Sequence, residues 1–201
     1  MKVLFLTSNK NKVTEANRIL SPLGYSVEQF LIDGHPPKLI EPQSNSIEVV
    51  SRYKIEQALR LISETIFENN ALLVEDSGLF IQSLNEFPGV YSSYVSKTIG
   101  NQGLLDILSG NPERIAEFRA YSILYKNGEY FSALGKCSGI ISTEIRGVNG
   151  FGFDPIFVPE SGDGRTFAEM SENEKASFSH RGESLRTVSY THLTLPTKRI
   201  V

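Results

Sequence analysis

Several short stretches of the sequence carry side chains that could bind or cleave a charged ligand. The first, TSNKNK, lies where an apolar run gives way to a helical pattern. A helix N-terminus offers free backbone N–H groups and a positive dipole end, both of which favour an anion. The stretch adds hydroxyl, amide and ammonium groups from Thr7, Ser8, Asn9, Lys10, Asn11 and Lys12. This pattern is typical of a phosphate site, although a capped helix start with solvated lysines would also produce it. It has no glycines and is therefore not a Walker loop.

Two further stretches, VEDSGL and LIEPQ, supply carboxylates. Glu75 and Asp76 close an apolar run, and the following Ser77-Gly78 predicts a turn. Consecutive strand side chains point to opposite faces, so the two carboxylates should not share a ligand unless the strand bends. We take Asp76 as the functional residue because crevices open at strand ends, the alternative being an Asx-turn aspartate. Glu41 near Asp76 would suit Mg²⁺, but alone it is an ordinary loop glutamate.

Two C-terminal stretches could bind a flat polar ring. In GFGFDPIF, Phe151 and Phe153 alternate with glycines, which would let a ring approach the backbone and stack, or would form a bulged strand with core aromatics. Downstream, ENEKASFSHRG contains Lys175, His180 and Arg181. Arg181 is a donor at every physiological pH and suits a carbonyl edge or a phosphate. His180 could equally be a capping or core histidine.

The elements that must position these residues follow an α/β pattern. Early helices alternate with strands and later strands run consecutively, which predicts a mixed sheet rather than a purely parallel one. Apolar runs and turn signals predict strands at 3–7, 25–32, 71–74 and 79–84, and a hairpin of 118–125 and 130–134 around Asn127-Gly128. Helical spacing predicts helices over 13–23, 45–65 and 103–108, and a last helical region from Ser171. Capping boxes are predicted for Asn45 with Glu48 and for Ser171 with Glu174.

Length and composition limit the class of protein. The 201 residues fit one domain or a single two-lobed one, and 40% hydrophobic with 21% charged residues is typical of a globular chain. No run reaches the ~18 apolar residues of a membrane span, and no signal peptide is recognisable, so we expect a cytoplasmic protein without a membrane partner. The lone Cys137 excludes an internal disulfide. The net charge of −3 argues against nucleic-acid binding but permits a local basic pocket.

The end of the chain, VSYTHLTLPTKRIV from Val188, resembles the translation of a transposon-derived sequencing adapter. We interpret residues 188–201 as a non-native, adapter-derived tail and residues 1–187 as one two-lobed domain. The alternative is a genuine C-terminal strand, suggested by the β-prone Val188, Tyr190 and Thr191.

Taken in order, TSNKNK, EPQ, VEDSG, FPGVYS, FGFDPIF, RTFAEMS, EK and SHRG resemble the Ham1-like inosine/xanthosine triphosphate pyrophosphatase family, in particular its archaeal-type branch. The resemblance runs from Lys2 to about Leu185. It implies an ITPase-like α/β fold: a central, mixed, strongly twisted β-sheet flanked by helices, with the nucleotide cleft between two lobes. It also implies a homodimeric, magnesium-dependent hydrolase. The expected substrates are non-standard purine nucleoside triphosphates (ITP, dITP, XTP), cut to monophosphate and pyrophosphate and so removed from the nucleotide pool.

The family's functional residues carry over onto matching positions. The resemblance implies phosphate contacts by Thr7 to Lys12, metal binding by Glu41 and Asp76, and catalysis by Asp76, with Glu75 as an alternative proton acceptor and Ser77 beside them. It implies nucleobase contacts by Phe151, Gly152, Phe153, Asp154, Lys175, His180 and Arg181. A donor-only Arg181 would favour the C6 carbonyl of inosine over the amino group of adenosine.

The chain also departs from the family pattern. Many relatives have a basic residue where this chain has Ser93, and Lys97 is a candidate substitute. A helix lysine of some relatives lies one position out of register here, at Lys54, and is not part of the predicted site. The family's final helix continues past SHRG, where this chain enters the suspected tail. Losing that helix should expose apolar core surface.

Two rival interpretations remain. A Maf-type nucleotide pyrophosphatase, which would prefer modified pyrimidines, dTTP or UTP, also begins with a strand and a polar basic turn, although FGFDPIF and SHR speak against it. A protein that binds or senses nucleotides without turnover is the other.

Overall fold

A computed structural model describes residues 1–61 and 70–194 of the chain. The C-terminal end of the predicted helix over 45–65, including Ile62 and Thr65, and residues 195–201 of the suspected tail lie outside the described residues. Within the described part, no helix combines the length and apolar character needed to cross a bilayer.

The described strands form one mixed sheet of seven strands, in the order β2-β1-β3-β5-β6-β7 with β4 also beside β3. The strands are β1 (Lys2–Phe5), β2 (Ser26–Gln29), β3 (Asn70–Ile81), β4 (Pro88–Gly89), β5 (Ile115–Lys126), β6 (Glu129–Ile141) and β7 (Phe157–Pro159). β1 pairs in parallel with β2 and β3, and every other pairing is antiparallel. The expected α/β fold with a mixed sheet is confirmed.

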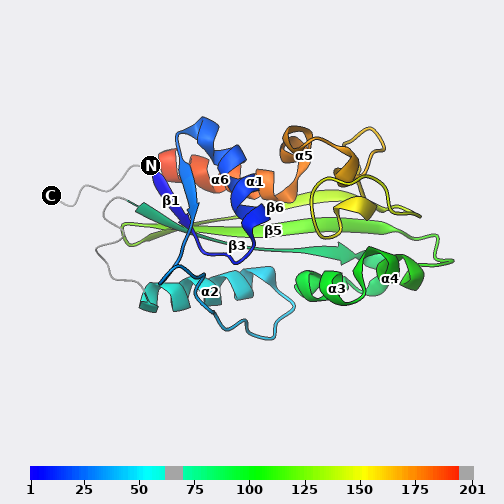
Figure 1. Ribbon diagram of the computed structural model, residues 1–201, viewed down its shortest axis with the longest axis horizontal. Helices are drawn as coiled ribbons and strands as arrows, with labels where there is room; N and C mark the ends of the chain where they lie inside the picture. Colours follow the sequence, from blue (N-terminus) through cyan, green and yellow to red (C-terminus); the bar gives the residue numbers. More distant parts are fainter. Residues whose placement is uncertain (62–69, 195–201) are drawn as a thin grey trace.

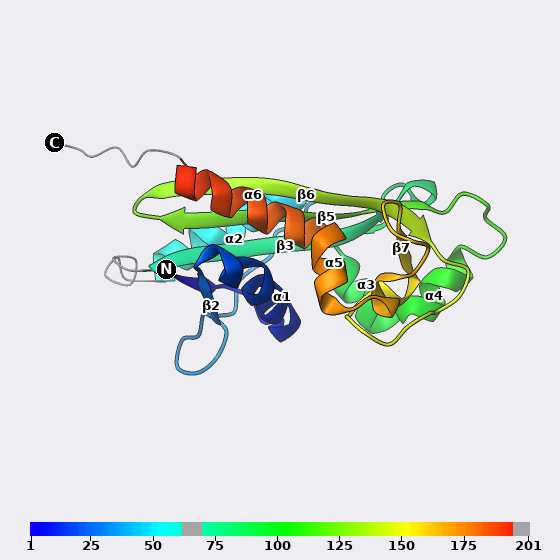
Figure 2. The same cartoon turned by 90° about the horizontal axis from the view of Figure 1, so that it is seen from above.

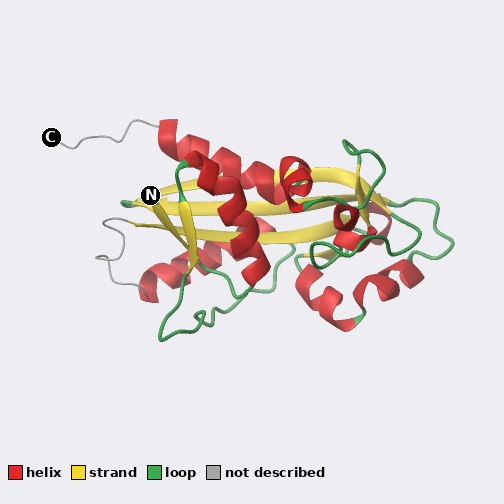
Figure 3. Cartoon of the chain, turned by 45° about the horizontal axis from the view of Figure 1, so that its top comes forward, coloured by secondary structure: helices red, strands yellow, loops and turns green. Residues whose placement is uncertain are grey.

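Helices cover both faces of this sheet. They are α1 (Lys10–Leu20), α2 (Ile47–Leu61), α3 (Ser92–Thr98), α4 (Gly100–Ile107), α5 (Glu172–Phe178) and α6 (His180–Thr194), with short 3-10 turns at Ser21–Leu23, Gln82–Leu84, Asp154–Ile156 and Phe167–Glu169. α1, α5 and α6 lie on one face, and α2, α3 and α4 lie on the other (Figure 1). The strands therefore form the middle layer between two helical layers (Figure 3).

The long strands β3, β5 and β6 run through two lobes. One end carries β1, β2, α1, α2 and α6, and the other carries α3, α4 and β7 (Figure 2). Three clusters of buried apolar residues hold these parts together. One lies between α1, α6 and the sheet and includes Phe5 and Leu185, a second lies under α2 and includes Ile55, and a third fills the far lobe around Phe118.

The predicted turn at EDSG is wrong. β3 continues through it, and each residue from Leu72 to Ile81 has a partner on β5, with Glu75 opposite Ser122 and Asp76 opposite Tyr121. The two predicted short strands are therefore one strand. Gly78 allows β3 and β4 to approach closely, because a Cβ there would lie 2.1 Å from the carbonyl oxygen of Gly89 on β4.

One edge of β3 stays open where it passes between the lobes. β1 ends at Phe5, opposite Leu73, and β4 pairs with β3 only from Leu79. Among the described residues no strand pairs with 74–78 on that side. Side chains on both faces of β3 can therefore reach the same gap.

Several predicted boundaries also shift. The hairpin around Asn127-Gly128 is confirmed, but β6 is one strand to Ile141, and α3 was not predicted. Ser46, rather than Asn45, caps α2, since its Oγ accepts from the N–H of Val49 at 3.3 Å. The capping box of Ser171 with Glu174 is confirmed.

The last helix crosses the predicted domain boundary. α6 runs to Thr194, so the alternative of a C-terminal strand is wrong for residues 188–194. Val188 is buried beside Leu185, so apolar core surface is covered at this point, contrary to our expectation. The adapter interpretation of residues 188–201 stays a prediction.

Candidate functional site

A cavity of about 1140 Å³ lies between the lobes at the open edge of β3. It is lined by every predicted site residue except Lys10: Thr7, Ser8, Asn9, Asn11, Lys12, Glu41, Asp76, Ser77, Phe151, Gly152, Phe153, Asp154, Lys175, His180 and Arg181. Lys10 lines a separate hollow with Asn17 and Gln29. The fold thus gathers residues from five sequence stretches into one cleft.

The TSNKNK stretch is both a capped helix start and part of the cleft. Asn9 caps α1, since its Oδ1 accepts from the N–H of Asn11 at 2.9 Å, and Thr7 Oγ1 accepts from the N–H of Asn9 at 3.1 Å. Lys12 is not a solvated lysine, because its Nζ lies 2.9 Å from Glu75 Oε2. Of the two lysines, Lys12 is the one that faces the cleft.

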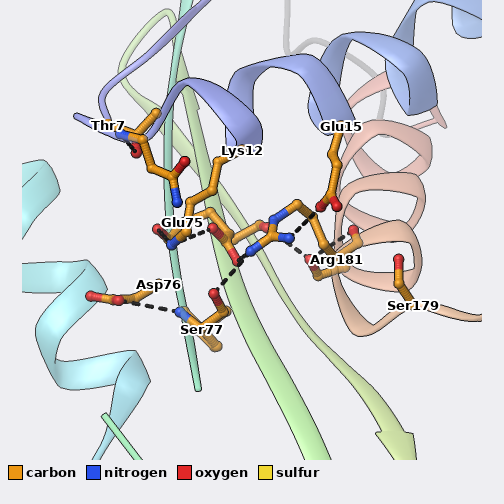
Figure 4. Close-up of polar contacts among 12 residues, drawn as sticks. Thr7, Lys12, Glu15, Glu75, Asp76, Ser77, Ser179 and Arg181 are labelled. Carbon is orange, nitrogen blue, oxygen red and sulfur yellow. Dashed lines mark hydrogen bonds and ion pairs between the residues drawn. The ribbon is translucent and has the colours of Figure 1, made fainter. Parts of the chain in front are cut away.

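Glu75 and Asp76 point to opposite faces of β3, as consecutive strand residues should (Figure 4). Glu75 faces α1 and α6, where its Oε1 accepts from Nη2 of Arg181 at 3.1 Å. The same Nη2 lies 3.0 Å from Ser77 Oγ. The side chain of Glu75 is fully buried, and the charges of Arg181 and Lys12 outweigh burial and hold its pKa far below the usual range.

Glu15, which was not among the predicted site residues, joins this buried cluster. Its carboxylate binds Lys175 Nζ at 2.7 Å and also Nη1 of Arg181. Burial alone would raise the pKa of Glu15, but the charges of Arg181 and Lys175 lower it from 4.5 to about 2. The sequence did contain one indication of this position: Glu15 follows Lys12 by three residues on α1, and helix positions three apart share a face.

The ring-binding stretches meet at the far end of this cluster. Asp154 Oδ2 accepts from Lys175 Nζ at 2.6 Å and from the N–H of Phe151 at 2.7 Å, which fixes the GFGF loop. The Phe151 ring lies 4.8 Å from Lys175 Nζ. Phe153 belongs to the apolar core as well as to the cavity wall. This end of the cleft therefore combines an aromatic face with buried charged donors.

His180 is buried in the wall of the cleft. Its ring stacks on Phe118 with centroids 4.7 Å apart, and burial, assisted by the charge of Arg181, lowers its pKa well below 6.5. α6 approaches β6 closely here, since a Cβ on Gly135 would lie 2.1 Å from the carbonyl oxygen of His180. Gly135 thereby lets α6 place His180 and Arg181 at the cavity.

Asp76 belongs to a second, more open cluster on the α2 side. Lys54 Nζ lies 2.7 Å from both Asp76 Oδ2 and Glu41 Oε1. Glu41 keeps 65% of its side chain exposed, in contrast to Glu75 with none. Burial opposes the charged form of Lys54, but the two carboxylates raise its pKa. Lys54 was left out of the prediction because it is one position out of register with its relatives.

Helix α3 forms the remaining wall. Ser93 and Lys97 both line the cavity, one helical turn apart, and Lys97 is exposed. The structure thus places the candidate substitute on the same wall as the position it would replace.

The fold and the cleft define an α/β protein with one cleft that combines ammonium, guanidinium, carboxylate and aromatic side chains. Asn9, Asn11 and Lys12 line it from the start of α1, Asp76 and Glu41 line it on the Lys54 side, and Phe151 and Arg181 line it from the GFGF loop and α6. The family model described as "Ham1 family" matches residues 3–190. The chain belongs to the Ham1 family.

Individual relatives agree with this assignment. The chain is 45% identical to the dITP/XTP pyrophosphatase of Thermococcus kodakarensis over 92% of this chain and 94% of that one. It is 44% identical to the dITP/XTP pyrophosphatase of Methanopyrus kandleri, over 92% and 93%. The solved structure of the Staphylococcus aureus Ham1 protein superposes with a TM-score of 0.76 at 26% identity, covering 96% of this chain and 98% of that one.

Proposed function

We propose that this protein is a magnesium-dependent pyrophosphatase that hydrolyses ITP, dITP and XTP to the monophosphate and pyrophosphate, and so removes them from the nucleotide pool. The observation that carries the proposal is the single cleft in which Lys12, the Glu41–Asp76 pair and the Phe151–Arg181 end are brought together. The relatives named dITP/XTP pyrophosphatase support it. Membership of the Ham1 family goes against the Maf-type alternative.

The carboxylates of the open cluster suit magnesium. Glu41 Oε1 and Asp76 Oδ2 converge on one cation, the ammonium of Lys54, so the same oxygens could share a divalent ion. Among the described residues no group of three or more His, Cys, Asp or Glu could hold a metal by itself. Mg²⁺ usually takes one or two carboxylates and completes its shell with water and substrate phosphates, which fits this pair. Bound there, the ion would supply charge neutralisation for the triphosphate.

The proton acceptor in this proposal is Asp76. It would take a proton from the water that attacks the phosphorus next to the nucleoside. Glu75 is less suited, because it is fully buried and Lys12 and Arg181 hold its two oxygens. Lys12, with the amides of Asn9 and Asn11, would stabilise the negative charge of the departing pyrophosphate.

Selectivity would come from the free donors of Arg181. Nη1 is bonded to Glu15 and Nη2 to Glu75 and Ser77, whereas Nε is buried and has no partner among the described residues. A purine C6 carbonyl facing Arg181 would accept a hydrogen bond, and a C6 amino group would leave two donors opposed.

Homodimerisation and a cytoplasmic location belong to this proposal through the family resemblance. Sedimentation of the purified protein tests the first, with a mass near twice 22.4 kDa expected.

The decisive experiment is a product assay. The protein is incubated with ITP, XTP, ATP, GTP, dTTP or UTP, with Mg²⁺ or with chelator, and pyrophosphate and orthophosphate are measured separately. We expect pyrophosphate from ITP and XTP only when Mg²⁺ is present. Activity confined to pyrimidines, release of orthophosphate, or binding without product would each reject the proposal.

A further inference from the structure

The buried side of the cleft contains a continuous chain of alternating charges. It begins in the GFGF loop and ends in the TSNKNK stretch, and its members are Asp154, Lys175, Glu15, Arg181, Glu75 and Lys12. Each neighbouring pair is in direct ionic contact, with 2.6 Å between Asp154 Oδ2 and Lys175 Nζ and 3.1 Å between Arg181 Nη2 and Glu75 Oε1. This series of ion pairs therefore connects the proposed nucleobase end with the proposed phosphate end.

Glu75 is the member that joins the two ends. Its Oε1 lies 3.1 Å from Nη2 of Arg181, and its Oε2 lies 2.9 Å from Nζ of Lys12. Its backbone is held on the β5 side of β3, opposite Ser122, while the other edge of the strand is open at this point. Its side chain is fully buried, whereas that of Lys12 is 15% exposed. The carboxylate is thus a fixed point from which both cations are positioned (Figure 4).

We propose that Glu75 is a positioning residue that sets the Lys12 ammonium and the Arg181 guanidinium relative to each other, so that one buried carboxylate controls both the phosphate end and the nucleobase end of the cleft. This inference rests on the proposed function, which assigns those two ends. It gives Glu75 a role separate from that of Asp76, its neighbour on the opposite face of β3.

A neutral side chain at position 75 cannot position both cations. Glutamine keeps the shape of Glu75 but offers one acceptor oxygen and no charge, so it cannot hold two cations. Lys12 and Arg181 would then repel each other without a shared counter-ion. In Glu75→Gln, the side chains at both ends of the cleft should therefore be displaced together. Replacing Lys12 or Arg181 leaves Glu75 fixed on the sheet and should affect only one end.

The test compares Glu75→Gln with two variants that affect one end each, Lys12→Met and Arg181→Lys. Inhibition by tripolyphosphate reports the phosphate end, and the ratio of kcat/KM for ITP over ATP reports the nucleobase end. We expect Glu75→Gln to raise the tripolyphosphate inhibition constant ~10-fold and to lower the ITP/ATP ratio ~10-fold, the size of a lost charged contact at each end. Lys12→Met should change only the first value, and Arg181→Lys only the second.

The matched control is Glu117→Gln. Glu117 on β5 pairs with Arg119 and Lys136, and it does not line the cavity. This variant should leave both values unchanged, which separates positioning from a general loss of an ion-paired carboxylate.

A change at only one end in Glu75→Gln overturns the inference, as does a fall in kcat with both reporting values unchanged. If Glu75→Gln does not fold, Glu75→Asp takes its place, because aspartate keeps the charge but is shorter by one methylene. This variant should shift the tripolyphosphate inhibition constant and the ITP/ATP ratio by ~3-fold each. Wild-type values for both reporters in Glu75→Asp would then contradict the proposal.

Failure of the proposed function has a different signature. If the wild-type protein releases no pyrophosphate from ITP, the function is rejected, and calorimetric binding of tripolyphosphate and of inosine still tests Glu75. Weaker binding of both ligands to Glu75→Gln supports the positioning role without any turnover. Weaker binding of one ligand, or of neither, overturns it.

Discussion

Glu75 and Asp76 are neighbours in sequence, yet they belong to two regions with opposite physical character. Glu75 lies in the closed cluster, where Arg181 and Lys175 are buried, Glu15 is partly buried, and each charge has a partner. Asp76 lies in the open cluster, where its partner Lys54 also binds the largely exposed Glu41. The alternation of a β-strand separates the two carboxylates, and the open edge of β3 lets both reach one cavity.

The difference indicates which contacts can be exchanged for a ligand. Breaking an ion pair in the closed cluster leaves a buried charge uncompensated, which is costly, so that cluster should hold its shape during binding. In the open cluster, solvent can replace Lys54 as the partner of the 65% exposed Glu41, so Glu41 can rearrange around a phosphate or a metal ion. We infer that the closed cluster positions the ligand and the open cluster does chemistry.

Asp76→Asn gives the largest expected effect and tests this division directly. Removing a positioned general base typically costs 10²- to 10⁴-fold, so we expect kcat on ITP to fall about 10³-fold. The melting temperature and the ITP/ATP ratio should stay close to wild type, because the closed cluster is intact. Steady-state kinetics measures kcat and the ITP/ATP ratio, and thermal unfolding measures the melting temperature. A large loss of stability, or retained activity, would contradict the assignment of Asp76 to chemistry.

Paired alanine variants compare the two clusters in stability. Glu15→Ala leaves Lys175 and Arg181 without their shared carboxylate, and we expect a loss of about 3–5 kcal/mol in the free energy of unfolding. Glu41→Ala removes a carboxylate that is 65% exposed, and we expect a loss below about 1 kcal/mol. Urea unfolding followed by circular dichroism gives both values. Equal losses would show that the two clusters do not differ as described.

Acid should weaken the closed cluster. The pKa of Glu15 is about 2 in the folded protein and about 4.5 when unfolded, so the folded state favours the charged form. Its contribution, about 3 kcal/mol from the shift, is fully present above pH 4.5 and is lost as the pH falls toward 2. Urea unfolding at pH 6 and pH 3 should show this loss in the wild type and a smaller loss in Glu15→Ala. An equal loss of unfolding free energy between pH 6 and pH 3 in both proteins would rule out Glu15 as the source of that loss.

The sequence predicted the composition of the cleft better than the strand that organises it. Motif order and residue chemistry grouped Asp76, Lys175 and Arg181, and all three line the same cavity. The turn chemistry of Ser77-Gly78 predicted the wrong local structure, because pairing of β3 with β5 over ten positions outweighs a local preference. No local pattern indicates such pairing.

Glu15 and Lys54 were left out for different reasons. Glu15 is a charged residue on a helix, where an exposed position is the usual expectation. Lys54 is one position out of register with a helix lysine of some relatives. Only the tertiary structure shows that Glu15 faces Arg181, 166 positions away in sequence, and that Lys54 lies between Glu41 and Asp76. Helix spacing from Lys12 would have suggested the face of Glu15, but not its partner.

The smallest expected effect concerns Lys97, which extends the comparison to the α3 wall. This lysine is exposed and lines the cavity one turn from Ser93, so it resembles the open cluster in its access to solvent. A solvated ammonium contributes roughly 0.5–1 kcal/mol to a charged contact, and we therefore expect Lys97→Gln to raise KM for ITP ~2- to 5-fold with kcat unchanged. Lys136→Gln, an exposed lysine outside the cavity, is the matched control and should change neither value. If Lys97 contacts the triphosphate, its effect should also shrink as salt rises, because screening weakens an exposed charge pair far more than a buried one. A KM that is unchanged, or changed equally at low and high salt, would remove Lys97 from the phosphate end of the cleft.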